Sequence, residues 1–567
     1  MSTLRRIVNN ALISLTGQAV TWSSTLLLTI AYGRFLGDVK FGELYFAMTF
    51  VALIGFPIEF GFNQQVTRDV AQDPEKASAY LWNALLIKVT LWVLLYAAIL
   101  FAAWALGYDQ EQRSLVSICG ITLVSGSIVS IFTALHYAFE RTLFPAVGLM
   151  LEKGLAACIG FILLKHGATV QTMAFVLLGG SLIDAIWVAL WFFRLVGWHV
   201  VINKAIIHKL LHTSIPFIVY GVLGVIYYRI DTVLLSLMAG SAVVGWYGAG
   251  YRLFDTLFFI PYLILNAIMY PVFSKLSASS QSTLKMAVEK CMNLLLICAL
   301  PIATLMIVAA PNIIGFLYHQ ADFANTIPVL QALAPGLVFL YINALFSTVI
   351  VSTRGEKKIP IMAAIALVFN LGLNLVLIPI YRQIGAALVT SLTELLLFCI
   401  SALFVPKYLL PGRSLKVGGK VLVATLFMAM VAFLLRTSSI LIIAPVALVV
   451  YGGTATLLGA IPREDMHMLY RSIRSKGERS STEIQTNVVD ENVFDRTTQP
   501  LPAMMVRRVH PELIIESEFA SESDATTASL PSVVNDTTVR LPTVGARRIQ
   551  PKVKIRKVRI QPEVVEE

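Results

Sequence analysis

The chain has 567 residues, of which 57% are hydrophobic and 14% are charged, and its formal net charge at pH 7 is +11. Ordinary soluble domains could not bury that much apolar surface, so the composition excludes a soluble protein. Apolar segments of about 20 residues recur, the length that a helix needs to cross a hydrocarbon core. Because backbone amides in hydrocarbon need internal partners, these segments predict an all-α integral membrane protein.

We predict fourteen spans, near 10–35, 42–62, 80–107, 115–138, 144–164, 170–193, 214–239, 243–274, 288–317, 328–352, 360–380, 384–406, 418–435 and 438–460. The eighth and ninth are unusually long, so we expect them to tilt or to continue into the aqueous layer. Eighteen Lys and Arg residues fall in the N-terminal segment and the even-numbered loops, and six fall at the other side. This positive-inside excess predicts that both termini are cytoplasmic.

The first predicted span carries a polar stripe. Ser14, Gln18, Thr21, Thr25 and Thr29 recur every three or four residues and therefore share one helical face. Such a face lines a watery cavity or packs against neighbouring helices through its hydroxyl groups, and both interpretations stay open.

The seventh span has a similar stripe, made of Tyr220, Gly224, Tyr227 and Asp231. We expect the tyrosines to stack on sugars or to pack among aromatic neighbours. Glu59, at the inner end of the second span, joins Asp231 and Asp255 as titratable candidates for ion coupling or for orienting a neighbour.

Four charges lie close to the membrane midplane. Arg229 and Arg252 stand twelve and eleven residues from the turn near Ser241, about 15 Å deep in the bilayer. In one interpretation Arg252 pairs with Asp255 and Asp231 closes a charge network across the hairpin. In the other, the arginines face a cavity and hold an anionic substrate, because their planar forks suit phosphate oxygens.

The last 107 residues differ in composition. Residues 461–567 carry 16 basic and 16 acidic residues and few aromatic ones, which predicts a mostly disordered cytoplasmic tail with a short helix near 463–476. "LPAMMVRRVHP" (501–511) recurs as "LPTVGARRIQP" (541–551), either as a docking motif or as a drifting duplication. We find no nucleotide-binding loop, nucleophile elbow or metal motif. We therefore expect a transporter rather than an enzyme, with no cofactor, metal or catalytic residue.

The two halves of the membrane body resemble each other. Gly37 and Gly42 correspond to Gly240 and Gly245 at an offset of 203 residues. Both copies start from the same side, so the repeat is parallel and predicts two pseudo-symmetric six-helix lobes with a site between them. The predicted parts are 1–212, 213–408, the two helices of 409–460, and the tail.

The chain resembles the polysaccharide flippase family of the multidrug/oligosaccharidyl-lipid/polysaccharide (MOP) exporter superfamily. The resemblance is carried by "NNALISLTGQ", "YGRFLGDVKFGELYF", "RIDTVLLSLMAGSAVVGWYGAGYRLFD", "YPVFSKLS" and "NLGLNLVLIPIYRQIGAALVTSLTE". It implies that the protein moves a polyprenyl-pyrophosphate-linked oligosaccharide across the bacterial inner membrane, beside polymerase or glycosyltransferase machinery and with no nucleic acid. It also implies that Arg252 binds the pyrophosphate, although the first span offers Gln18 where related flippases place an arginine.

Two other functions remain as alternatives. One is a cation-coupled multidrug exporter of the same superfamily, which the cationic Arg229 and Arg252 disfavour. The other is a membrane scaffold that acts through its repeated tail.

Overall fold

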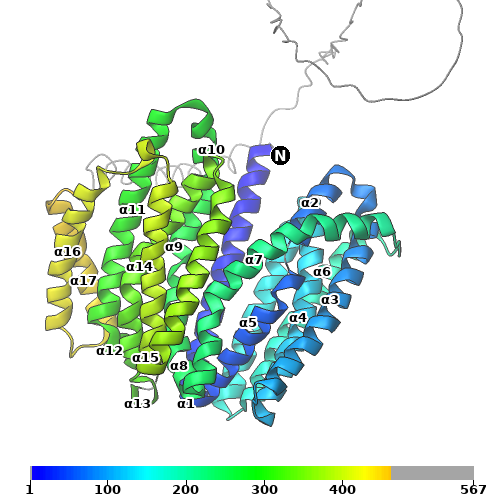
Figure 1. Ribbon diagram of the computed structural model, residues 1–567, viewed down its shortest axis with the longest axis horizontal. Helices are drawn as coiled ribbons and strands as arrows, with labels where there is room; N and C mark the ends of the chain where they lie inside the picture. Colours follow the sequence, from blue (N-terminus) through cyan, green and yellow to red (C-terminus); the bar gives the residue numbers. More distant parts are fainter. Residues whose placement is uncertain (1–2, 60, 319, 461–567) are drawn as a thin grey trace, which may run out of the picture. The chain divides into compact units, whose positions relative to one another are not determined.

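The computed structural model describes residues 3–59, 61–318 and 320–460, and in these ranges the chain is helical without strands (Figure 1). Eleven helical stretches are long and apolar enough to cross a membrane. Two of them are pairs of helices joined at a kink, at Gly37 in α1 and at Arg382 in α15. Counting both members of each pair, and adding the 36-residue α7, accounts for the fourteen predicted spans.

The helices follow one another in this order: α1 (Thr3–Gly55), α2 (Phe62–Gln72), α3 (Ala77–Ala105), α4 (Gln110–Ala138), α5 (Leu143–Lys165), α6 (Val170–Val196), α7 (Lys204–Ala239), α8 (Ser241–Leu257), α9 (Phe259–Tyr262), α10 (Tyr270–Ser279), α11 (Gln281–Val308), α12 (Ala310–Leu317), α13 (Gln320–Phe323), α14 (Thr326–Ser352), α15 (Ile359–Phe404), α16 (Ser414–Leu434) and α17 (Ile440–Leu457). The tail, its repeated motif and the helix expected near 463–476 lie outside the described residues.

The spans pack as two groups. In the first group α3 and α6 pack on α4, and α5 packs on α6 and α1; in the second, α14 packs on α8, α11 and α15, and α7 packs on α15 (Figure 1). α16 and α17 pack on each other, and α16 packs on α11. Helix α1 also contacts α7 and α8, so it connects the two groups. The domain boundaries given above remain predictions.

The repeated glycines adopt matching backbone conformations. Gly37 has φ 75° and ψ 178°, and Gly240 has φ 88° and ψ 175°. This positive φ favours glycine, and in both repeats it turns the chain sharply between two spans. The sequence repeat is therefore also a repeat of local structure.

The second pair of repeated glycines forms a close contact where α1 crosses α8. A Cβ atom added at Gly42 would lie 1.9 Å from the carbonyl oxygen of Ser241, and one added at Gly245 would lie 2.1 Å from that of Asp38. Asp38 and Ser241 are themselves 203 positions apart, so the two contacts are reciprocal, as at an isologous interface. We call this contact the glycine crossing; it places a pseudo-two-fold axis between the halves.

The two long predicted spans are interrupted rather than simply tilted. Helix α8 ends at Leu257 and is followed by α9, a π-helix over Leu263–Met269, and α10. The ninth span ends at Val308, and the following apolar residues form the separate short helix α12. Pro261 and Pro311 lie next to these breaks, where a missing amide hydrogen ends the regular ladder.

A carboxylate outside the spans joins three helices. Oδ2 of Asp69 in α2 accepts hydrogen bonds from Tyr80 in α3 at 2.7 Å and from Gln65 at 2.6 Å, and it pairs with Lys209 of α7 at 2.7 Å. Burial alone would raise the pKa of Asp69, but the three donors stabilise the anion more strongly, so its pKa is lowered. The cluster fixes the start of α7 against the first group.

Candidate functional site

Both mid-membrane arginines line one cavity. Its volume is about 200 Å³, and its walls come from α1, α6, α7 and α8. Thr25 and Thr29 from the stripe of the first span lie in the same wall, together with Tyr32, Tyr45 and Thr49. The polar stripe of α1 and the two arginines were predicted independently as possible cavity-lining groups. In the structure they line the same cavity. We call this space the arginine cavity.

The two guanidinium groups share one carboxylate. Oδ2 of Asp255 lies 3.8 Å from Nη1 of Arg252 and 4.0 Å from Nη2 of Arg229. The side chains of both arginines are about 30% exposed, and Nε of Arg252 is buried without a hydrogen-bond partner among the described residues. One negative charge for two positive ones leaves an excess of cation. The arrangement is suited to binding a phosphate, which offers several oxygens to planar N–H forks.

Asp231 does not close this network. It is 3% exposed, accepts a hydrogen bond from the hydroxyl group of Tyr247 and another from the backbone N–H of Thr232 at 2.6 Å. The hydroxyl group of Tyr247 also lies 3.3 Å from that of Thr390 in α15. The carboxylate that bridges the arginines is therefore Asp255, and Asp231 belongs to a buried contact between α7, α8 and α15.

Tyr227 also faces the interior of the second group and not the arginine cavity. Its hydroxyl group donates to Oε1 of Glu394 at 2.8 Å, while Asn343 donates to the other carboxylate oxygen at 2.7 Å. Both Tyr227 and Glu394 are buried. This contact connects α7, α14 and α15. Tyr220 lies in α7, and its side chain is outside the part of the chain that the structure describes.

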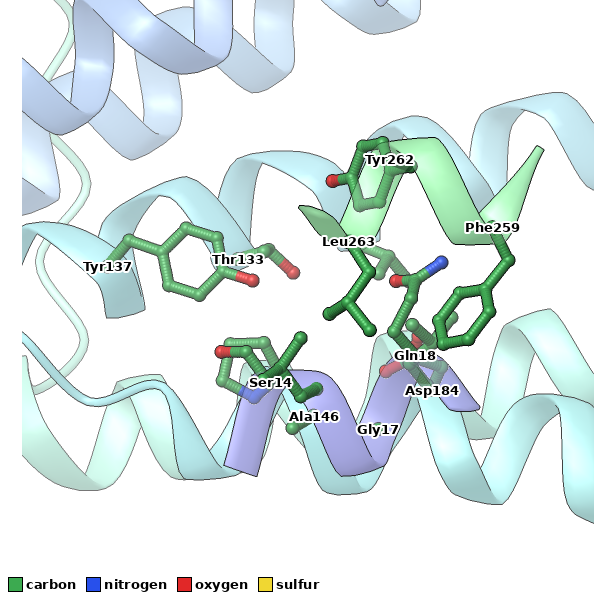
Figure 2. Close-up of a pocket in the computed structure, with 14 residues that line it drawn as sticks. Ser14, Gly17, Gln18, Thr133, Tyr137, Ala146, Asp184, Phe259, Tyr262 and Leu263 are labelled. Atoms are coloured by element: carbon green, nitrogen blue, oxygen red, sulfur yellow. The ribbon is translucent and has the colours of Figure 1, made fainter. Parts of the chain in front are cut away.

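Gln18 lines a second cavity, of about 470 Å³, farther toward the start of α1. Figure 2 shows the α1 turn with Ser14 and Gln18 opposite the segment that carries Phe259, Tyr262 and Leu263. The polar stripe therefore borders two cavities, while Thr21, Thr25 and Thr29 bond back to carbonyl oxygens of their own helix, four residues earlier.

Glu59 has a cationic partner. Nζ of Lys88 lies 3.2 Å from Oε2 of Glu59 and 2.6 Å from the hydroxyl group of Ser130. The lysine side chain is fully buried, whereas the glutamate is 32% exposed. This ion pair joins the end of the second span to α3 and α4. Within the described residues, no cluster of three or more His, Cys, Asp or Glu side chains forms a metal site.

The sequence reasoning missed Tyr45. This residue lines the arginine cavity, and its ring occupies the space that the absent side chain of Gly248 leaves free. Tyr45 and Gly248 are 203 positions apart, so the repeat offset contained the signal.

Comparison with known proteins supports the fold. The polysaccharide biosynthesis protein family matches residues 7–277, and the MatE family matches residues 216–379. No curated protein sequence matches the chain significantly.

Solved structures give the same result. The lipid II flippase MurJ in an inward closed conformation superposes with a TM-score of 0.66 at 16% identity, over 79% of this chain and 98% of that one. An inward-facing MATE multidrug transporter of the MOP superfamily gives 0.57 at 15% identity, over 70% and 98%. A mutant MATE transporter from Vibrio cholerae gives 0.50 at 14%, over 71% and 96%. At these identities the likeness shows the fold. The chain is a multi-pass membrane protein that shares its fold with the lipid II flippase MurJ and a MATE transporter, and two overlapping stretches of it match the polysaccharide biosynthesis protein and MatE families.

Proposed function

We propose that the protein is a flippase that moves a polyprenyl-pyrophosphate-linked oligosaccharide from the cytoplasmic to the outer leaflet of the bacterial inner membrane during polysaccharide biosynthesis. The observation that carries the proposal is the arginine cavity, where Arg229 and Arg252 share a single carboxylate, Asp255. An uncompensated charge is costly at this depth, so an anionic ligand would stabilise the site. The match to the polysaccharide biosynthesis family over residues 7–277 supports the same substrate class.

The mechanism follows from the placement of the cavity. The polyprenyl chain stays in the bilayer while the pyrophosphate enters between the two groups of helices and meets both guanidinium forks. Asp255 orients the arginines and is released from them as phosphate oxygens take its place. Since the sequence has no nucleotide-binding loop, turnover depends on an ion gradient, the membrane potential or consumption of the glycan by the polymerase or glycosyltransferase machinery. Asp231, Asp255 and Glu59 remain the candidates for ion coupling.

Complementation of a polysaccharide-deficient deletion strain tests the proposal. We would compare Arg252→Ala, Arg252→Lys and a truncation of 461–567, with membrane abundance measured by blotting. The exposed Arg436 of the loop before α17 provides the matched control, Arg436→Ala. We expect glycan-linked lipid to remain on the inner leaflet only with the Arg252 variants, and Lys to substitute poorly because it lacks the planar fork.

The alternatives predict other outcomes. A multidrug exporter would transport amphipathic cations and would not need Arg252. A scaffold would lose function as severely with the tail truncation as with Arg252→Ala. Normal transport by a stable Arg252→Ala variant would refute the pyrophosphate role of the arginine cavity.

A further inference from the structure

The proposed pyrophosphate site does not include the second cavity, which lies on the same face of α1 as the arginine cavity. Gln18 borders it, and Thr25, seven residues later, borders the arginine cavity. At 1.5 Å per residue the two sites are about 10 Å apart along the helix. A short saccharide attached to the pyrophosphate would reach that far.

The walls of the second cavity combine hydrogen-bonding groups with aromatic rings. The carboxamide of Gln18 offers both donors and an acceptor, and Ser14 and Thr133 add hydroxyl groups. Phe259 and Tyr262 face them (Figure 2). These rings are held in place by Trp22, whose centroid lies 4.3 Å from that of Phe259 and 5.8 Å from that of Tyr262. Such a combination is suited to a sugar, which presents hydroxyl groups at its edges and C–H groups on its faces.

The charge in this wall has one sign. Among the described residues, the lining includes Asp184 but no Lys or Arg. Asp184 is 1% exposed, and its Oδ1 has no hydrogen-bond partner among the described residues. The nearby Lys153 pairs with Glu152 at 2.6 Å. Gly148 leaves room for the carboxylate, because a Cβ atom there would lie 2.1 Å from Oδ1. Asp184 also lies beside Glu152, so two carboxyl groups share one ammonium group, that of Lys153. An acidic sugar in the cavity would add a further like charge to this acidic pair.

We propose that this cavity, formed by Gln18, Phe259, Tyr262 and Asp184, is the subsite for the sugar next to the pyrophosphate and that it selects an uncharged sugar over an acidic one. The inference rests on the proposed function and adds the chemical class of the first sugar. Gln18 hydrogen-bonds its hydroxyl groups, the aromatic rings pack on its face, and Asp184 sets the charge preference.

Binding to the purified full-length protein in lipid nanodiscs tests the subsite. The probes are farnesyl pyrophosphate, farnesyl pyrophosphate carrying N-acetylglucosamine, and the same lipid carrying glucuronic acid. We expect the unmodified protein to bind the neutral-sugar probe about ten-fold more tightly than the acidic one, since like charges oppose each other there. Asp184→Asn should narrow that ratio toward one.

Gln18→Ala tests the hydrogen bonds separately. It should weaken binding of the neutral-sugar probe roughly two- to ten-fold and leave farnesyl pyrophosphate unchanged. The exposed Gln281 at the start of α11 gives the control, Gln281→Ala, which should bind all probes like the unmodified protein.

The outcomes separate the two proposals. If farnesyl pyrophosphate binds and depends on Arg252, but the unmodified protein does not distinguish neutral from acidic sugars, the subsite is refuted and the proposed function stands. The comparison needs no variant, so poor folding of Asp184→Asn does not affect it. If no pyrophosphate lipid binds, both proposals are refuted.

Discussion

Substituting Ala for Gly245 should disrupt the glycine crossing between α1 and α8. The added Cβ atom would lie 2.1 Å from the carbonyl oxygen of Asp38 and 3.3 Å from the amide nitrogen of Gly42. The normal contact distance between a carbon and an oxygen atom is more than 1 Å longer than this, and both opposing atoms belong to the backbone, which cannot rotate away. Overpacking of this kind costs typically 1–3 kcal/mol, and we expect about 3 kcal/mol because the contact is so short.

That cost applies only while the two halves are in contact. If the crossing opens during transport, Gly245→Ala would shift the equilibrium toward the open conformation by roughly 150-fold. The shift can be measured with Ala52→Cys as a reporter, since Ala52 lines the arginine cavity, in a background without the five native cysteines. We expect a membrane-impermeant maleimide added from outside to label this cysteine much faster in the Gly245→Ala variant.

Gly372→Ala provides the control. Gly372 also lies inside a helix, α15, but an added Cβ atom there meets nothing within 4 Å. It should leave labelling unchanged and stabilise the helix by about 1 kcal/mol. If Gly245→Ala labels at the same rate as Gly372→Ala and unfolds at the same temperature, the crossing does not separate and the reasoning fails.

Four further substitutions test three contacts described above. Glu59→Gln leaves the fully buried ammonium group of Lys88 without its counter-ion and should lower the free energy of unfolding by about 3–5 kcal/mol. Lys88→Met leaves a carboxylate that water can reach and should lower it by less. Thermal unfolding in detergent compares the two variants, and equal losses of stability would contradict this difference. Tyr227→Phe removes the hydrogen bond to Glu394, so the free energy of unfolding should fall by about 1 kcal/mol. The affinity for farnesyl pyrophosphate, measured by titration, should stay unchanged. Asp69→Asn should lower the unfolding temperature at pH 7, because a carboxyl group with a lowered pKa stabilises the folded state while it is ionised. This stability is lost as the pH falls through the lowered pKa, so a difference in unfolding temperature that does not shrink with falling pH would contradict the reasoning.

The sequence predicted the number of spans well because lipid requires a minimum apolar length. It could not locate the interruption after Leu257, since the apolar run continues through Pro261 and the π-helix. It also could not divide 288–317 at Val308, where hydropathy does not change. Length and hydropathy report whether a segment can cross the membrane but not where its hydrogen-bond ladder breaks.

The candidate site was predictable in part. Arg252 and the stripe of α1 were identified from depth and periodicity. One of the two interpretations of the four charges had Asp231 close the charge network across the hairpin, and the structure does not show that contact. The actual bridge is Asp255. Tyr227 donates to Glu394 of α15, 167 positions away, and Tyr247, which donates to Asp231, lies beside Thr390 of α15, 143 positions away. Such contacts depend on how distant helices meet, which no local pattern encodes.

The two-fold relation of the halves reveals how unevenly the arginine cavity is charged. At the offset of 203 residues, Arg252 corresponds to Thr49 and Asp255 to Ala52, and both of these lie in the cavity wall. The wall thus pairs a neutral half from α1 with a charged half from α7 and α8. If a pyrophosphate binds there as proposed, its charge-assisted bonds would all be to one half. The cavity would then open without breaking any of these bonds, and release would fall to the side on which the ligand is consumed.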